Sequence, residues 1–419
     1  MKKTIFSVIA LVLCFVLCSP SNSYLINAGG GEEDETGLQE TDAGTNEDAI
    51  ETVNTNTLVI EAKSAVLIEG STGKILFEKE KDLQMEPASI TKIMTLLLIF
   101  EALDEGKIKL TDTVSVSEHA ASMGGSQVYL EPYETQNVDT MIKCISIASA
   151  NDASVAMAEF LAGSETEFVA RMNARAKELG MMNTNFENCC GLDDTTVNHV
   201  STSYDVALMS RELITKHPEV QKYTTTWMDS FVHVTKKGES EFGLTNTNKL
   251  VRTYNGITGL KTGSTSKAKY CVSATAKRGD MDLIAVIMCA PQPVVRFQDA
   301  AKLLDYGFAT VKLYKDDNKD LVIEPVHVKG GVVDTVDGSV NDIFSYVCFD
   351  GQSPEDISKE ILLYEEVPAP IAVGDAIGEI TYKLDGEVIG KIPICAKEDI
   401  REMNYADALF KMFDKFFID

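Results

Sequence analysis

Pro-Ala-Ser-Ile-Thr-Lys-Ile-Met-Thr, residues 87–95, opens an apolar stretch that runs to Leu103 and stops near Gly106. Proline in a first turn and glycine after a last turn are signals that start and end a helix. If Ser89 opens this helix, Lys92 lies one turn further on the same face, where its amine reaches the Ser89 hydroxyl. A serine hydroxyl becomes a nucleophile beside a base, and a desolvated lysine can act as one. Taken alone, these residues are better interpreted as a helix cap and a solvated charge.

Two further motifs follow this stretch and change that interpretation. They are Ser149-Ala150-Asn151 and Lys261-Thr262-Gly263. Each is short enough to occur by chance. In this order, however, the three form the set found in serine β-lactamases and penicillin-binding proteins, with Ala150 where the usual example has Asp. The combination predicts acyl transfer through Ser89.

The second motif falls between two predicted helices, where a loop can present a hydroxyl and an amide to a cleft. We expect Ser149 to relay a proton toward the leaving amine and Asn151 to hold the substrate's peptide group. The alternative is a helix C-cap followed by an N-cap, which is ordinary in isolation.

The third motif precedes a predicted strand. We expect Lys261 and Thr262 to hold the terminal carboxylate of the substrate, and Gly263 to let the substrate backbone approach. An edge strand at this place could pair with an extended peptide. The oxyanion of acyl transfer needs N–H donors, for which the backbone amides of Ser89 and Ser264 are candidates. The alternative is a plain turn leading into the strand.

The periodicity of the chain predicts an α+β fold. Strands are expected at both sequence ends of a helical block, so that the terminal segments meet in one antiparallel sheet with helices, followed by a small β-sandwich of short strands. In the catalytic region, the expected strands are residues 65–69, 74–77, 270–276 and 283–289. The expected helices are residues 90–103, 138–148, 152–161, 165–179, 203–215 and 296–309. The expected strands of the sandwich are residues 326–328, 345–347, 360–364, 377–382 and 391–394.

The two ends of the chain predict an exported protein. A basic start, an apolar run and small polar residues form a secretory signal over residues 1–23, with a spanning helix or a lipoprotein signal as weaker alternatives. Residues 24–56 are acidic and form a disordered spacer. Residues 57–316 are then the catalytic serine peptidase domain, 317–397 the β-rich domain, and 398–419 an amphipathic helix. That helix contacts a membrane surface or, alternatively, packs on its own domain.

Composition excludes several other functions. The net charge of -26 argues against nucleic acid as a partner, because phosphates need clustered basic residues. Seven cysteines lie beyond the signal, an odd number without metal-ligand spacing, and we expect mostly buried thiols. The five histidines are scattered, with surface or packed roles. We expect no metal and no cofactor.

With these motifs, the chain resembles the low-molecular-mass penicillin-binding proteins of the D-alanyl-D-alanine carboxypeptidase family. The likeness extends to Ser-Ala-Asn-Asp-Ala at 149–153, Gly-Leu-Lys-Thr-Gly at 259–263, and Arg296 ahead of Leu-Leu-Asp-Tyr-Gly-Phe at 303–308. It implies a serine β-lactamase/transpeptidase-like fold, in which penicillin acylates Ser89. Lys92, Ser149 and Asn151 complete the catalytic set. The substrate-binding residues it implies are Lys261, Thr262, Gly263, Ser264 and Arg296.

The implied function is removal of the terminal D-alanine from peptidoglycan stem pentapeptides, at the outer face of the cytoplasmic membrane or in the cell wall, with secretion as an alternative. Two positions depart from the family: Ser264, where some relatives carry a larger polar residue, and Lys269, which stands before Tyr270 where a glycine is common. A serine β-lactamase is the nearest competing function, but no Glu-x-x-x-Asn element for deacylation lies between Asn151 and Lys261. A catalytically inactive wall-binding relative is the second alternative.

Overall fold

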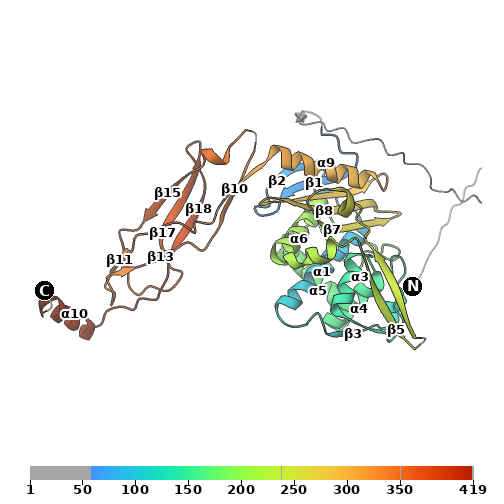
Figure 1. The fold of residues 1–419 in the computed structure, drawn as a ribbon, viewed down its shortest axis with the longest axis horizontal. Helices are drawn as coiled ribbons and strands as arrows, with labels where there is room; N and C mark the ends of the chain where they lie inside the picture. The colour runs from blue at the N-terminus through green and yellow to red at the C-terminus, as the bar shows by residue number, and fades with distance from the viewer. Residues whose placement is uncertain (1–57, 237, 350, 418–419) are drawn as a thin grey trace, which may run out of the picture. The chain divides into compact units, whose positions relative to one another are not determined.

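The computed structural model describes residues 58–236, 238–349 and 351–417. The predicted signal and acidic spacer lie outside these residues. Five antiparallel strands form the sheet of the catalytic region, in the order β2-β1-β9-β8-β7 (Figure 1). Their bounds are β1 Ser64–Glu69, β2 Ile75–Lys79, β7 Ile257–Thr265, β8 Lys269–Arg278 and β9 Met281–Ala290.

The sheet joins the two sequence ends of the catalytic region, as predicted. β1 pairs with β9 from Ser64 opposite Met288 to Glu69 opposite Leu283. Every residue of β1 is buried, because both faces of the strand are covered. Side chains of a strand alternate between faces, so Val66 packs into the helical core while Leu67 packs on the other side.

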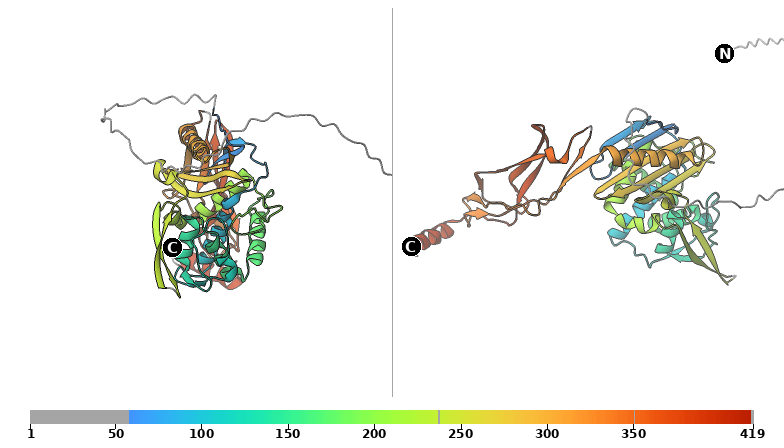
Figure 2. Two further views of the ribbon diagram at one scale, coloured as in Figure 1. Left: turned by 90° about the vertical axis from the view of Figure 1, so that its right-hand side faces the viewer. Right: turned by 45° about the horizontal axis from the view of Figure 1, so that its top comes forward.

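Helices cover the two faces of this sheet. The helix α9 (Val295–Thr310) lies along one face, where Leu303 and Leu304 pack against β8 and β9 (Figure 2). The other face carries the helical block, and the helices predicted there are confirmed. The longer ones are α1 Lys92–Asp104, α3 Val138–Ser146, α4 Asn151–Ala162, α5 Glu165–Glu178 and α6 Ser203–Lys216. Shorter elements are β3 Thr113–Ser115, α2 Glu118–Ala121, β4 Thr135–Asn137, η2 Pro218–Val220, α7 Gln221–Thr224 and α8 Leu250–Thr253.

Three local predictions need correction. The helix of the first motif begins with a 3-10 turn, η1 (Ala88–Thr91), before α1 starts at Lys92. The third motif lies inside β7 and not ahead of a strand, because β7 continues past Gly263 to its turn with β8. The middle of the chain is less helical than expected, since it contains the hairpin of β5 (Met228–Thr235) and β6 (Gly238–Thr245).

The C-terminal region is rich in short strands, as predicted. One sheet has the order β13-β18-β17-β15, a second β12-β11-β16, and a third pairs β10 with β14. Side chains from the first two sheets share one hydrophobic core, among them Val326, Val328, Ile380 and Ile394. The bounds are β10 Lys312–Asp316, β11 Val326–Lys329, β12 Thr335–Val336, β13 Gly338–Ser339, β14 Phe344–Cys348, η3 Pro354–Asp356, β15 Ser358–Leu363, β16 Glu366–Pro368, β17 Ala376–Leu384 and β18 Glu387–Ala396.

The last element is the helix α10 (Tyr405–Phe417), so a C-terminal helix forms as predicted. It begins later than the predicted residue 398, because Ile400 pairs with Ile371 and packs in the core of the C-terminal region. Within the described ranges, none of the helices combines the length and apolar character that crossing a bilayer requires.

Candidate active site

The first motif forms a strained turn beneath the edge strand β7. Ala88, just before Ser89, has φ 48°, a left-handed conformation that residues with a side chain rarely adopt. A Cβ on Gly263 would stand 2.8 Å from the Pro87 carbonyl oxygen and 3.0 Å from the Ser89 amide nitrogen. Only glycine therefore lets β7 pass so close to the turn that presents Ser89.

Lys92 is fully buried and bonds three oxygens from three segments of the chain. Its Nζ lies 2.9 Å from Ser89 Oγ, 2.6 Å from Asn151 Oδ1 and 2.7 Å from the Cys190 carbonyl oxygen. Burial lowers the pKa of Lys92 to about 8, despite the nearby Asp152 carboxylate, which raises it. At pH 7 about one lysine in ten is then neutral.

These three bonds orient the amine once it loses its proton. A neutral amine keeps two N–H donors and one lone pair. Asn151 Oδ1 and the Cys190 carbonyl can only accept, so they take the two donors. The lone pair is left for the Ser89 hydroxyl, which is the arrangement that a general base requires.

The second motif presents its residues at the start of α4. Ser149 is buried and has φ 62°, so the chain turns sharply between α3 and α4. Asn151 is held by its neighbours: its amide nitrogen donates to the Ser126 carbonyl and its Nδ2 to the Gly124 carbonyl, both at 2.7 Å. The amide group of Asn151 therefore has one orientation, with Oδ1 toward Lys92.

The third motif places a second buried lysine beside the first. Lys261 is 1 % exposed, and burial lowers its pKa well below the usual value, with Lys92 and Arg296 adding to the effect. Thr262 Oγ1 donates to Thr247 Oγ1 at 2.6 Å. The strand expected after this motif, 270–276, is β8 and lies inside the sheet, whereas the edge is β7, the strand that carries the motif itself.

The remaining predicted substrate residues lie on and behind β7. Arg296, at the start of α9, donates from Nη1 to the Gly263 carbonyl at 3.1 Å, and its buried Nε has no hydrogen-bond partner among the described residues. Burial lowers the pKa of Arg296. Ser264 is exposed and pairs in register with Tyr270. Lys269 has φ 57°, the conformation that favours glycine at this turn.

Sequence reasoning missed the segment of residues 188–193. Besides the Cys190 carbonyl on Lys92, Gly191 passes so near the nucleophile turn that a Cβ would meet the Ala88 carbonyl oxygen at 1.8 Å. Asn188 Oδ1 accepts hydrogen bonds from the amides of Cys190 and Gly191. These bonds hold the backbone in the turn that brings Gly191 close to Ala88. The available signal was Gly191 between Asn188 and Asp193, which is typical of a turn and does not by itself indicate a contact with the first motif.

His199 is packed beside the first motif, in agreement with the expected packed role. The Glu187 amide donates to its Nδ1 at 3.0 Å, so Nε2 carries the proton and donates to Thr91 Oγ1 at 2.8 Å. Burial lowers the pKa of His199 to about 4, and the ring is neutral at pH 7. It therefore acts on the turn as a neutral hydrogen-bonding group.

The thiols of the described residues are unpaired and mostly buried, which confirms that prediction. No group of three or more His, Cys, Asp and Glu side chains in the described ranges is arranged to hold a metal ion.

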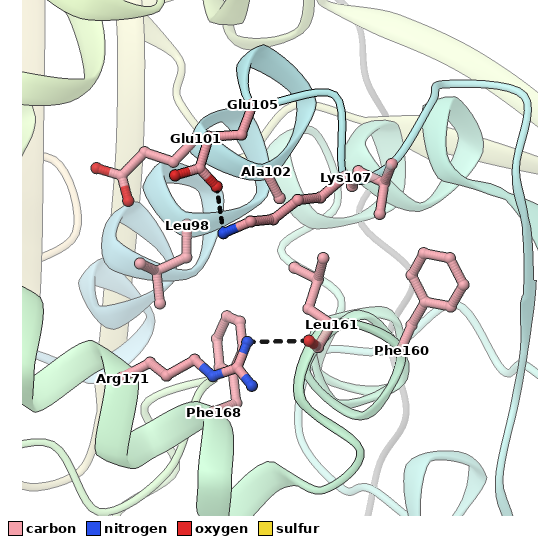
Figure 3. A pocket seen from close by; sticks show the side chains of 10 residues that line it. Leu98, Glu101, Ala102, Glu105, Lys107, Phe160, Leu161, Phe168 and Arg171 are labelled. Carbon is pink, nitrogen blue, oxygen red and sulfur yellow. Dashed lines mark hydrogen bonds and ion pairs between the residues drawn. The ribbon is translucent and has the colours of Figure 1, made fainter.

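A surface pocket of about 350 Å³ lies apart from the motif residues (Figure 3). It is formed by the C-terminal part of α1 with α4 and α5. Leu98, Leu161 and Phe168 line it, and Arg171 donates from Nη1 to the Leu161 carbonyl at 3.0 Å. None of the predicted site residues lines it, so the motif geometry and not this pocket identifies the candidate site.

Comparison with known proteins agrees with the motif geometry. Residues 50–292 match the family described as D-alanyl-D-alanine carboxypeptidase, and residues 308–402 match the C-terminal domain of penicillin-binding protein 5. The chain is 45% identical over 351 residues to the D-alanyl-D-alanine carboxypeptidase DacF of Bacillus subtilis, which covers 84% of this chain and 89% of that protein.

Solved structures show the same likeness. Penicillin-binding protein 5 from Haemophilus influenzae superimposes with a TM-score of 0.69 at 30% identity, over 82% of this chain and 98% of that one. Penicillin-binding protein D2 from Listeria monocytogenes, in its ampicillin-bound form, gives a TM-score of 0.53 at 32% identity, over 60% of this chain and 99% of that one.

Proposed function

The chain belongs to the D-alanyl-D-alanine carboxypeptidase family, and on this premise we propose how its residues remove a terminal D-alanine from a peptidoglycan stem pentapeptide. It is a serine-type carboxypeptidase, a hydrolase of the penicillin-binding class. The residue roles rest above all on one observation, the 2.9 Å bond between Lys92 Nζ and Ser89 Oγ inside a buried set of acceptors.

Acylation begins when neutral Lys92 takes the proton of Ser89 and the Ser89 oxygen attacks the carbonyl of the penultimate D-alanine. The amides of Ser89 and Ser264 receive the developing oxyanion. Support for this pair comes from the close approach of β7 to the Ser89 amide at Gly263. Ser149 passes a proton to the leaving amine, so that free D-alanine departs and an ester remains on Ser89.

Substrate binding is assigned to the edge of β7. The extended stem peptide pairs with this strand, Asn151 holds its peptide group, and Lys261 with Thr262 binds the terminal carboxylate. Arg296 adds positive charge behind Gly263. Water then hydrolyses the ester and returns Ser89 to its starting state.

Two assays test this proposal. A labelled penicillin should form a covalent adduct that Ser89→Ala abolishes, and the enzyme should release D-alanine from a stem pentapeptide. Absence of the adduct, or its survival in Ser89→Ala, contradicts the role of Ser89. Hydrolysis of the β-lactam without D-alanine release would favour the β-lactamase alternative. If the enzyme formed no penicillin adduct, released no D-alanine and hydrolysed no β-lactam, the inactive wall-binding alternative would be favoured.

Export and membrane contact form a separate part of the proposal. Residues 1–23 are assigned as a cleaved signal, so that the enzyme acts at the outer face of the membrane or in the wall. The helix α10 is assigned as a peripheral anchor, because Tyr405, Phe410 and Met412 are exposed, with Phe410 71% exposed. Sedimentation with lipid vesicles tests the anchor: the full mature chain should bind them, and a chain ending at residue 402 should not.

A further inference from the structure

The segment of residues 128–134, here called the tyrosine segment, is held at both ends by buried carboxylates. At its start, the amides of Val128 and Leu130 both donate to Asp152 Oδ2 at 3.1 Å. At its end, the Glu134 carboxylate accepts from the Glu131 amide and from His233 Nδ1, each at 2.9 Å. Asp152 follows Asn151 directly, so one end of the segment is fixed to the active site.

Between these anchors, two tyrosines point outward from unfavourable backbone conformations. Tyr129 has φ 60° and Tyr133 φ 68°, and their side chains are 64% and 66% exposed. A bulky residue in the left-handed region costs free energy, on the order of 1 kcal/mol or more. Such a cost at two exposed aromatic residues is not explained by core packing and indicates a function on the surface.

Both rings are already fixed in place. The Tyr129 ring packs edge-on against Phe242 of β6, with ring centroids 6.0 Å apart. The Tyr133 hydroxyl donates to Glu118 Oε1 at 2.7 Å. A ligand that stacks on these rings therefore has little side-chain freedom to remove.

Each tyrosine lines its own hollow beside the β5–β6 hairpin. A pocket of about 320 Å³ holds Tyr129 with Phe242 and Glu239, and a neighbouring pocket of about 310 Å³ holds Tyr133 with Pro132. Glu131 lines both. The two hollows thus offer two aromatic faces in succession, with carboxylate oxygens between and beside them.

We propose that the tyrosine segment and the β5–β6 hairpin form a saccharide-binding subsite for the glycan strand of the wall polymer that carries the stem peptide. The apolar face of a sugar ring stacks on an aromatic face, while its hydroxyls donate to carboxylates. Glu131 and Glu239 in the first hollow disfavour an anionic polymer, while Lys236 also lines the second hollow. The bonds of Val128 and Leu130 to Asp152 tie the start of the segment to the residue that follows Asn151. The proposal rests on the proposed function, since that function supplies a substrate attached to a glycan.

The test separates the glycan from the peptide. Wall glycan stripped of its stem peptides is sedimented with the full mature enzyme. The variants are Tyr129→Ala, Tyr133→Ala and Tyr129→Phe, with Tyr364→Ala as a matched exposed tyrosine from the C-terminal region. Thermal unfolding checks that each variant is folded.

We expect each alanine variant of the segment to bind stripped glycan about three- to tenfold more weakly, while Tyr129→Phe and Tyr364→Ala bind as the parent enzyme does. The KM for D-alanine release from intact wall should rise in parallel, with kcat/KM for a soluble pentapeptide within about twofold of the parent value. The proposal is overturned if the parent enzyme does not bind stripped glycan, or if folded alanine variants bind it equally well.

Failure of the proposed function would look different. In that case the parent enzyme would release no D-alanine from the soluble pentapeptide, while the sedimentation result would still decide whether the glycan subsite exists.

Discussion

Among the edge strands of the described residues, β7 and β15 have different surroundings. In β7 the residues from Thr258 to Gly263 are all buried, although the strand ends its sheet. In β15, the edge of the largest C-terminal sheet, five of six residues are exposed. Charged side chains protect β15: Lys359 pairs with Asp316 at 2.8 Å, and Glu360 with Lys383 at 2.7 Å.

An open edge strand invites unwanted pairing, and charges along it are a common protection. The strand β7 has no such protection, because its one charged residue, Lys261, is buried inside the protein. An edge strand without exposed charges is open to pairing with an extended peptide, as proposed above for β7, whereas the charges along β15 oppose such pairing. Four experiments test this difference between β7 and β15.

The largest effect on acylation is expected from replacing Gly263 of β7 by alanine, with Gly378→Ala next to β15 as the matched change. Gly263→Ala places a Cβ 2.8 Å from the Pro87 carbonyl oxygen, whereas Gly378→Ala, in the neighbouring strand β17, places one 2.6 Å from the Leu362 carbonyl oxygen of β15. The first should slow acylation by labelled penicillin at least about 100-fold, because β7 must move from the nucleophile turn. The second should lower the melting temperature and leave acylation unchanged. Equal acylation rates for Gly263→Ala and the parent enzyme would contradict the comparison.

A second test concerns the loop that Asp152 holds beside Asn151. Asp152→Asn weakens the hold on Val128 and Leu130, loosens the loop that orients Asn151, and should slow acylation about tenfold. The matched control is Asp299→Asn, another buried aspartate, which accepts from the Glu61 and Ala62 amides at 2.9 Å. It should lose stability only. The Asp152 carboxylate raises the pKa of Lys92, so removing its charge lowers that pKa. The acylation rate should then begin to rise at lower pH, which a purely structural defect would not cause.

The third test uses pH. Because burial lowers the pKa of Lys92 to about 8, acylation should rise roughly tenfold from pH 7 to pH 9 and then level off. The unfolded chain holds this proton up to the usual value of 10.5, so the free energy of unfolding should also rise with pH between about 8 and 10.5. Stopped-flow acylation and denaturant titrations measure the two effects. An acylation rate that is constant from pH 6 to pH 9 would rule out Lys92 as the base.

The smallest effect is expected at the turn that ends β7. Lys269→Gly relieves a left-handed backbone, with φ 57°, and should raise the free energy of unfolding by about 0.5–1 kcal/mol. Asp385→Gly, at φ 51° in the turn between β17 and β18, should raise it less, because aspartate tolerates this conformation better than lysine. Denaturant unfolding of both variants makes the comparison. A loss of stability in Lys269→Gly would show that the lysine side chain stabilises the turn.

The sequence predicted those parts of the site that depend on side-chain spacing. Ser89 and Lys92 meet because they lie one turn apart, and β1 pairs with β9 because both are apolar with clear turn signals. The roles assigned to Ser149, Asn151, Lys261, Thr262, Gly263, Ser264 and Arg296 remain predictions, although the structure brings them into one region.

The parts that were missed depend on main-chain groups. The hydrogen bond from Lys92 to the Cys190 carbonyl cannot be predicted from the residue type at position 190, because every residue has a main-chain carbonyl. The β5–β6 hairpin was not predicted because the exposed positions 228, 232 and 234 of β5 are Met, Val and Val, so the residue types do not alternate although the burial does. The strand β7 itself was not predicted, because its glycines at 259 and 263 are typical of turns, and the strand expected after the Lys-Thr-Gly motif is β8.

The seven thiols of the described residues are unpaired, and this affects how the enzyme folds after export. If the chain leaves the cytoplasm unfolded, all seven meet the outside medium before Cys144, Cys189 and Cys271 become buried. Folding then competes in time with oxidation, and any mismatched bridge formed first would block the core. Productive secretion therefore favours either a reducing habitat or folding fast enough to shelter the sulfur atoms before an oxidant arrives.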